Sequence, residues 1–118
     1  MSTDLPPQIK NQLAQLQQIQ QQAQAIAVQK NQVEITLKET DLALEELEKV
    51  DADAVVYRAI GDLLIRTERD KTKESLKEKK DTLDLRMQTL ARQEERAQKR
   101  FQQLQEQLKQ AIGTPTAQ

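Results

Sequence analysis

Few side chains in this sequence are suited to catalysis or metal binding. The 118 residues include no His and no Cys, which excludes an imidazole base, a thiol nucleophile, a disulfide and a soft-metal site. Tyr57 and Ser75 have no base to activate their hydroxyl groups. Asp51 and Asp53 resemble the opening of a calcium loop, but nothing downstream completes it. We therefore expect a non-enzymatic protein with no catalytic, cofactor-binding or metal-binding residues, acting through its surfaces.

The composition limits the kinds of partner and the fold. A net charge of −1 and only two aromatic residues argue against nucleic-acid binding. The sequence has no apolar stretch long enough for a membrane span and no signal peptide, which predicts a cytoplasmic protein without membrane contact. Hydrophobic residues make up 36%, too few for a compact core. The abundance of Ala, Glu, Lys, Leu, Arg and Gln is instead typical of a coiled coil.

A first helix is expected over about residues 5–50. Asp4 is its expected N-cap, with Pro6 and Pro7 in the first turn, where their missing N–H groups cost nothing. One row of positions, spaced alternately by four and three, is apolar at ten of thirteen places. The row is Leu5, Ile9, Gln12, Leu16, Ile19, Ala23, Ile26, Lys30, Val33, Leu37, Thr40, Leu44 and Leu47.

A second helix is expected over about residues 71–112, followed by a short tail over 113–118. Gly113 and Pro115 are typical of a helix end. Its row is Leu76, Lys80, Leu83, Met87, Leu90, Glu94, Ala97, Phe101, Leu104, Leu108 and Ala111. The predicted fold class is all-α with a small β-hairpin, in which the two helices form an antiparallel coiled coil within a single unit of residues 1–118.

The linker, about residues 51–70, is predicted to form a β-hairpin. Gly61-Asp62 between two apolar, β-branched runs is a type II′ turn signal, although a long irregular loop is the alternative. Apolar residues fall on both faces, with Tyr57, Ala59 and Leu64 on one and Val56, Ile60, Leu63 and Ile65 on the other. A lone hairpin is marginally stable. We therefore interpret this segment as the oligomerisation element.

A turn at Gly61-Asp62 pairs helix residues whose numbers sum to roughly 123, within half a heptad. Lys30 and Glu94 then lie within about one layer of each other. We expect them to meet and to help fix the register; the alternative is that both side chains extend to water. The acidic segment 34–53 lies beside the basic segment 66–80 in this arrangement, a complementary pairing.

The free tip is expected to be poor in charge. Residues 1–29 and 101–118 contain only Asp4, Lys10, Glu106 and Lys109 as charges. Apolar residues also lie outside the seam, namely Leu13 and Ile112 at the tip and Val28, Ile35 and Leu42 along the first helix. From the pattern alone these residues fit packing against another chain along the whole length, scattered exposure, or an adhesive tip for apolar segments of other proteins.

The segment 12–30, the hinge Val56-Tyr57-Arg58-Ala59-Ile60-Gly61-Asp62-Leu63-Leu64-Ile65 and the stretch 86–96 resemble the β class of prefoldin subunits, most closely the archaeal ones. The Val-Tyr-x-x-x-Gly-x-Leu-Leu hinge is the most specific part. The resemblance implies a hexamer of two α-class and four β-class subunits, whose hairpins assemble into a double β-barrel. It further implies an ATP-independent holdase that captures unfolded proteins at coiled-coil tips and delivers them to a group II chaperonin.

The resemblance favours the adhesive tip and confines chain–chain packing to the hinge. The expected client-binding residues are Leu5, Ile9, Leu13, Leu16, Ile19, Phe101, Leu104, Leu108 and Ile112. The expected oligomerisation residues are Val56, Tyr57, Ile60, Gly61, Leu63, Leu64 and Ile65. Several tip residues also belong to the seam, so they can contact clients only where the helix ends separate. The alternative function is a coiled-coil scaffold or tether for specific folded partners.

Overall fold

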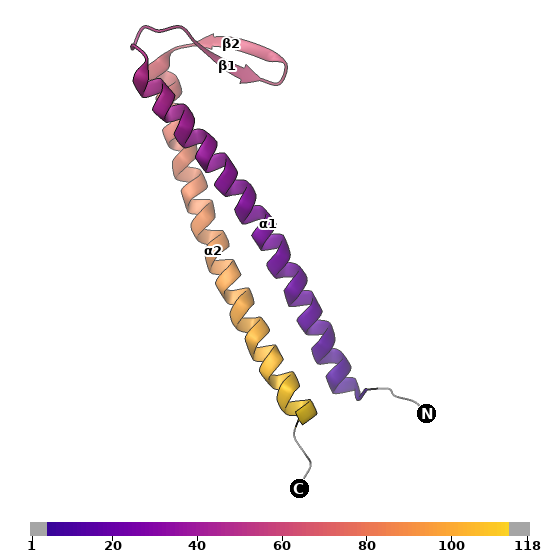
Figure 1. The fold of residues 1–118 in the computed structure, drawn as a ribbon. Helices are drawn as coiled ribbons and strands as arrows, with labels where there is room; N and C mark the ends of the chain where they lie inside the picture. Colours follow the sequence, from indigo (N-terminus) through magenta and orange to yellow (C-terminus); the bar gives the residue numbers. More distant parts are fainter. Residues whose placement is uncertain (1–4, 114–118) are drawn as a thin grey trace. The chain divides into compact units, whose positions relative to one another are not determined.

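A computed structural model describes residues 5–113, with four elements in the order α1 (Pro7–Lys49), β1 (Val56–Ile60), β2 (Leu63–Thr67) and α2 (Arg69–Gly113), as drawn in Figure 1. The predicted fold class, two long helices separated by a β-hairpin, is confirmed. The chain forms two compact units. The terminal unit comprises Met1–Lys30 and Thr89–Gln118, and the hairpin unit comprises Asn31–Gln88.

Helix α1 begins slightly later than expected. The backbone N–H of Lys10 donates to the carbonyl oxygen of Pro6 at 3.0 Å, so Pro6 takes the N-cap position and Pro7 is the first helical residue. The placement of Pro6 inside the first turn was therefore wrong. The expected N-cap Asp4, and Pro115 with the tail after Gly113, lie outside the described residues.

Helix α2 begins two residues before the expected start. The backbone N–H of Thr72 donates to the Glu68 carbonyl at 3.0 Å, and the Thr72 hydroxyl donates to the same oxygen at 2.8 Å. The helical hydrogen-bond pattern therefore starts directly after strand β2, leaving only Glu68 between strand and helix. At the other end of the hairpin, α1 stops at Lys49, and a turn is closed by the Ala54 N–H on the Asp51 carbonyl at 3.0 Å.

Strands β1 and β2 form an antiparallel hairpin, so the alternative of an irregular loop is wrong. Val56 pairs with Thr67 and Ile60 with Leu63, which leaves Gly61 and Asp62 as the two turn residues. Gly61 has a φ of 57°, the left-handed conformation that tight hairpin turns require at this position and that glycine adopts without strain. The register places the apolar residues on the two faces as the alternation predicts.

The predicted heptad row forms the seam between the helices. In α1 and the residues before it, every member except Leu5 is buried or half-buried, and in α2 every member except Ala111 is. Leu90, Ala97 and Leu104 are buried in the terminal unit, and Val33 and Thr40 in the hairpin unit. The Thr40 hydroxyl donates to the Thr36 carbonyl of its own helix at 2.8 Å, which satisfies this buried polar group.

Within residues 5–113, neither helix contains a stretch with the length and hydrophobicity needed to cross a bilayer. The same residues hold no cluster of three or more acidic side chains arranged for a metal ion.

Candidate functional site

The β-hairpin carries the largest group of exposed apolar side chains in the hairpin unit. Five of its large apolar residues are about half exposed or more, from 45% for Ile65 to 72% for Leu64, with Tyr57, Ile60 and Leu63 between them, whereas Val56 is half-buried. Ile60, Leu63 and Ile65 lie on one face, and Tyr57 and Leu64 on the other. Both faces of the hairpin therefore present apolar area that residues 5–113 of one chain leave uncovered.

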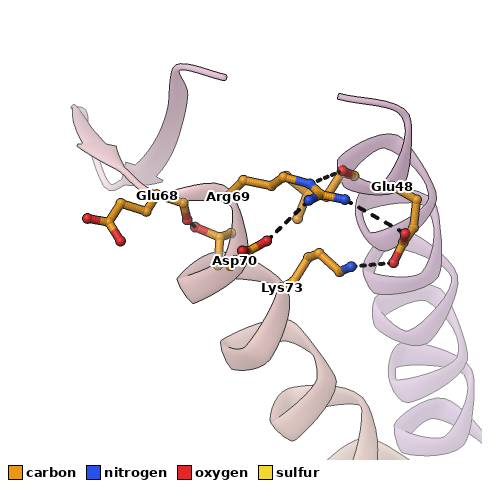
Figure 2. A network of polar contacts seen from close by, with 7 residues as sticks. Glu48, Glu68, Arg69, Asp70 and Lys73 are labelled. Carbon is orange, nitrogen blue, oxygen red and sulfur yellow. Dashed lines mark hydrogen bonds and ion pairs between the residues drawn. The ribbon is translucent and has the colours of Figure 1, made fainter. Parts of the chain in front are cut away.

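The junction between hairpin and helices is fixed by Arg69, the first residue of α2 (Figure 2). Its Nε donates to the carbonyl oxygen of Leu47 at 2.8 Å, one of the carbonyls in the last turn of α1. The guanidinium also pairs with Asp70 at 3.2 Å and lies 3.8 Å from Glu48. With only 15% of its side chain exposed, Arg69 joins the end of one helix to the start of the other.

Two ion pairs extend this connection along the hairpin unit. Lys73 Nζ lies 2.6 Å from Glu48 Oε1, and Lys80 Nζ lies 2.8 Å from Asp41 Oδ1. The pKa of Glu48 is lowered because Lys73 donates a hydrogen bond to it and attracts its charge. The pKa of Lys80 is raised because Asp41 accepts its hydrogen bond and attracts it. A lowered carboxyl pKa and a raised ammonium pKa both favour the folded state throughout the neutral range, by a small amount at such exposed sites.

The expected client-binding residues all lie in the terminal unit, at different depths. Leu5, Leu13 and Ile112 are exposed, by 43%, 37% and 61%. Leu104 is only 1% exposed and is enclosed by the seam. The remaining members are half-buried, namely Ile9, Leu16, Ile19, Phe101 and Leu108. In the closed helix pair, Leu5, Leu13 and Ile112 are therefore accessible to a client, whereas Leu104 is not.

Gln12 places a polar side chain in this otherwise mostly apolar seam. Its side-chain oxygen Oε1 is buried and has no hydrogen-bond partner among the described residues. A buried acceptor without a partner costs about 1–3 kcal/mol. The helix pair is therefore less stable at Gln12, next to the exposed Leu13, than its apolar layers would make it.

Lys30 and Glu94 are in contact within the terminal unit. Lys30 Nζ lies 2.9 Å from Glu94 Oε1, and the two side chains are 29% and 31% exposed. Their numbers sum to 124, Lys80 and Asp41 sum to 121, and every hairpin pair sums to 123. Each unit therefore keeps the fold-back register expected from the turn position. That the Lys30–Glu94 pair helps to fix this register remains a prediction.

A double-mutant cycle measures this pair. We expect Lys30→Leu and Glu94→Leu each to destabilise the chain, because each removes one partner of a half-buried ion pair, and the double variant to recover about 0.5–1.5 kcal/mol as coupling energy. Chemical denaturation at fixed protein concentration gives the free energies. The exposed pair Lys99–Glu95 is the matched control and should couple by no more than about 0.5 kcal/mol. Equal coupling in both cycles would show that the seam pair is an ordinary surface pair.

The terminal unit carries a net charge that is not evident from the charge-poor segments 1–29 and 101–118 alone. Six of the nine residues in 92–100 of α2 are charged, and the terminal unit includes this segment. In its described residues, 5–30 and 89–113, seven basic side chains accompany three acidic ones, whereas the hairpin unit has eleven basic and fifteen acidic ones. The terminal unit is therefore net positive. The positive charge could have been found from the sequence by summing the charges of residues 5–30 and of the segment 89–113 that folds back beside them.

Comparison with known proteins identifies the family. Residues 10–114 match the family model described as "Prefoldin subunit". Prefoldin subunit beta of Methanococcoides burtonii is 64% identical over 114 residues, covering 97% of both chains. That of Methanosarcina acetivorans is 57% identical over the full length of both. The crystal structure of the prefoldin beta subunit from Thermococcus strain KS-1 superposes with a TM-score of 0.85 at 38% identity, covering 97% of this chain and 100% of that one.

The family model spans nearly the whole chain, and the structural similarity covers both helices and the hairpin. The chain therefore belongs to the prefoldin subunit family, and within it to the β class.

Proposed function

We propose that this chain is the β-class subunit of an ATP-independent holdase, which captures unfolded proteins on its terminal unit and assembles through its hairpin. The chaperone-subunit role follows from membership of the family. The observation that supports the division of labour is the separation of two apolar surfaces into different units. One is the hairpin with both faces exposed, and the other includes Leu5, Leu13 and Ile112.

Assembly is proposed to involve an α-class prefoldin subunit, in a cytoplasmic hexamer of two α and four β chains. Partner hairpins would pair with the edges of β1 and β2, and closure of the resulting sheet into a barrel would bury the side chains of its inner face. Several terminal units in one assembly raise the effective concentration for a bound client, so weak individual contacts add to a useful affinity.

Capture needs no nucleotide, because binding to the unfolded state is mass action. The exposed Leu13 and Ile112 are available in the closed helix pair, and the unpaired Gln12 oxygen favours local separation that would release Ile9, Leu16 and Leu108. Release is proposed to occur by handover to a group II chaperonin. No catalytic residue or cofactor takes part in this mechanism.

Light scattering of an unfolded client tests the proposal. A chemically denatured protein is diluted into buffer without ATP, in the presence of this chain pre-mixed with an α-class subunit. Leu13→Gln with Ile112→Gln should require about threefold more complex for equal suppression of aggregation, because two exposed aliphatic contacts are lost while helix propensity is kept. The complex itself should remain assembled, as checked by size-exclusion chromatography with light scattering.

The matched control is Val28→Gln with Ile35→Gln, which removes two aliphatic side chains of α1 that are 58% and 50% exposed. This control should suppress aggregation as well as the unmodified complex. If the assembled wild-type complex suppresses no aggregation, the holdase proposal is wrong and a scaffolding role takes its place. If the Leu13 and Ile112 variant fails to assemble, the proposed division between the two surfaces is wrong.

A further inference from the structure

The terminal unit contains a shallow groove along the contact between α1 and α2, away from the residues at the helix ends. Its α1 side is formed by Ile19, Gln22, Ala25 and Ile26, and its α2 side by Gln93, Arg96, Ala97 and Arg100. Ala97 is buried, and Ile19 and Ile26 are half-buried, so the floor is apolar. The groove is therefore a place where an apolar side chain of a partner can be desolvated.

One rim of the groove is cationic. Arg96 and Arg100 are both exposed and stand four residues apart on α2, so their side chains are neighbours on the helix surface. No acidic residue lines the groove, and neither arginine forms an ion pair with any residue in 5–113. By contrast, nearby Lys99 pairs with Glu95 at 3.2 Å and does not line the groove. Two guanidinium groups beside an apolar floor are thus left for a partner.

We propose that this groove binds unfolded segments in which a large apolar side chain is flanked by carboxylates. The apolar side chain would lie on Ile19, Ile26 and Ala97, and the carboxylates would pair with Arg96 and Arg100, whose planar guanidinium groups suit carboxylate geometry. The proposal rests on the proposed function and names the client class it favours. It also adds a binding place that requires no separation of the helices.

The groove favours an acidic peptide over nucleic acid. No aromatic side chain lines it for base stacking, and its polar groups besides the two arginines are the amides of Gln22 and Gln93. The net positive charge of the terminal unit would also raise the rate at which acidic segments arrive. A single-stranded oligonucleotide is therefore expected not to compete with a bound acidic peptide.

Three unstructured peptides test the proposal with the full-length chain. Each has a Leu-Ile-Phe centre flanked on both sides by two acidic, two neutral or two basic residues, and carries an uncharged dye for fluorescence anisotropy. We expect the acidic peptide to bind about three- to tenfold more tightly than the neutral one at low salt, and the difference to shrink at high salt. Arg96→Gln with Arg100→Gln should abolish the preference, so that the acidic and neutral peptides bind with equal affinity.

The matched control is Arg92→Gln with Lys99→Gln, which removes the same charge from α2 in the same unit but not from the groove. In this control, the logarithm of the ratio between the Kd values of the neutral and acidic peptides should be at least half of its wild-type value. Equal loss in both variants, no preference at all, or displacement of the peptide by a thymidine oligonucleotide would overturn the proposal. Aggregation suppression by the wild-type complex, assembled with an α-class subunit, separates the two levels. Suppression without acidic preference refutes only the groove, and loss of suppression refutes the proposed function.

Discussion

Replacing both Ile60 and Ile65 with lysine is expected to abolish assembly while leaving most of the helix content. These residues lie on the same face of the hairpin, one on each strand, and are 49% and 45% exposed in the single chain. If partner hairpins cover that face, each substitution exchanges buried apolar area for a charge that must lose its water. The expected weakening of assembly is at least about 100-fold, from a few kcal/mol for two unpaired charges.

Size-exclusion chromatography with light scattering, after mixing with an α-class subunit, measures the effect, and circular dichroism at 222 nm follows the helices. The matched control is Ile35→Lys with Leu42→Lys, two side chains of α1 in the same unit that are 50% and 60% exposed. The control should assemble normally, because no partner is proposed for that part of α1. Assembly by the Ile60 and Ile65 variant would show that the hairpin does not organise the complex, and failure of the control would indicate packing along the helix.

The fold could be predicted because its determinants are local and periodic. A seam residue such as Leu37 or Leu90 is recognised from its spacing alone, since only a coiled coil keeps the four–three alternation facing inward over so many turns. Gly61-Asp62 likewise specifies the turn through backbone conformation, and the turn then fixes every strand pair. With the turn placed, arithmetic on residue numbers brings Lys30 and Glu94 within about one layer of each other, and the structure shows the two side chains in contact.

The features that escaped prediction depend on which side chains face each other across the seam. Arg69 is one base among seven in residues 66–80, and nothing in its local sequence indicates that its guanidinium bonds the Leu47 carbonyl. Arg96 and Arg100 look like a solvated helix face until Ile19 and Ile26 are placed beside them. A heptad pattern defines the layer of a residue, but the partner of an exposed rim residue depends on the register and on side-chain conformation.

Arg69→Met is expected to lower the free energy of unfolding by about 1–3 kcal/mol. We expect this loss to be larger than that from replacing any other charged residue of the chain. The substitution keeps a long side chain with good helix propensity and removes the guanidinium. What is lost is a charged hydrogen bond to a helix-end carbonyl, together with pairing to Glu48 and Asp70. The burial of Arg69, at 15% side-chain exposure, makes this bond stronger than a surface contact.

The loss should also appear in assembly, because the Leu47 contact holds the start of α2, and with it the end of β2, against the last turn of α1. Chemical denaturation at fixed protein concentration gives the stability, and titration with an α-class subunit gives the assembly. Arg86→Met, at an exposed position of α2 in the same unit, is the matched control and should change stability by less than about 0.5 kcal/mol. Equal stability of the two variants would show that a hydrogen bond from water to the Leu47 carbonyl is as favourable as the one from Arg69. A hairpin that Arg69 does not hold should lose more conformational entropy on assembly, which weakens binding to its partners. A loss of stability without weaker assembly would therefore show that Arg69 only joins the two helices.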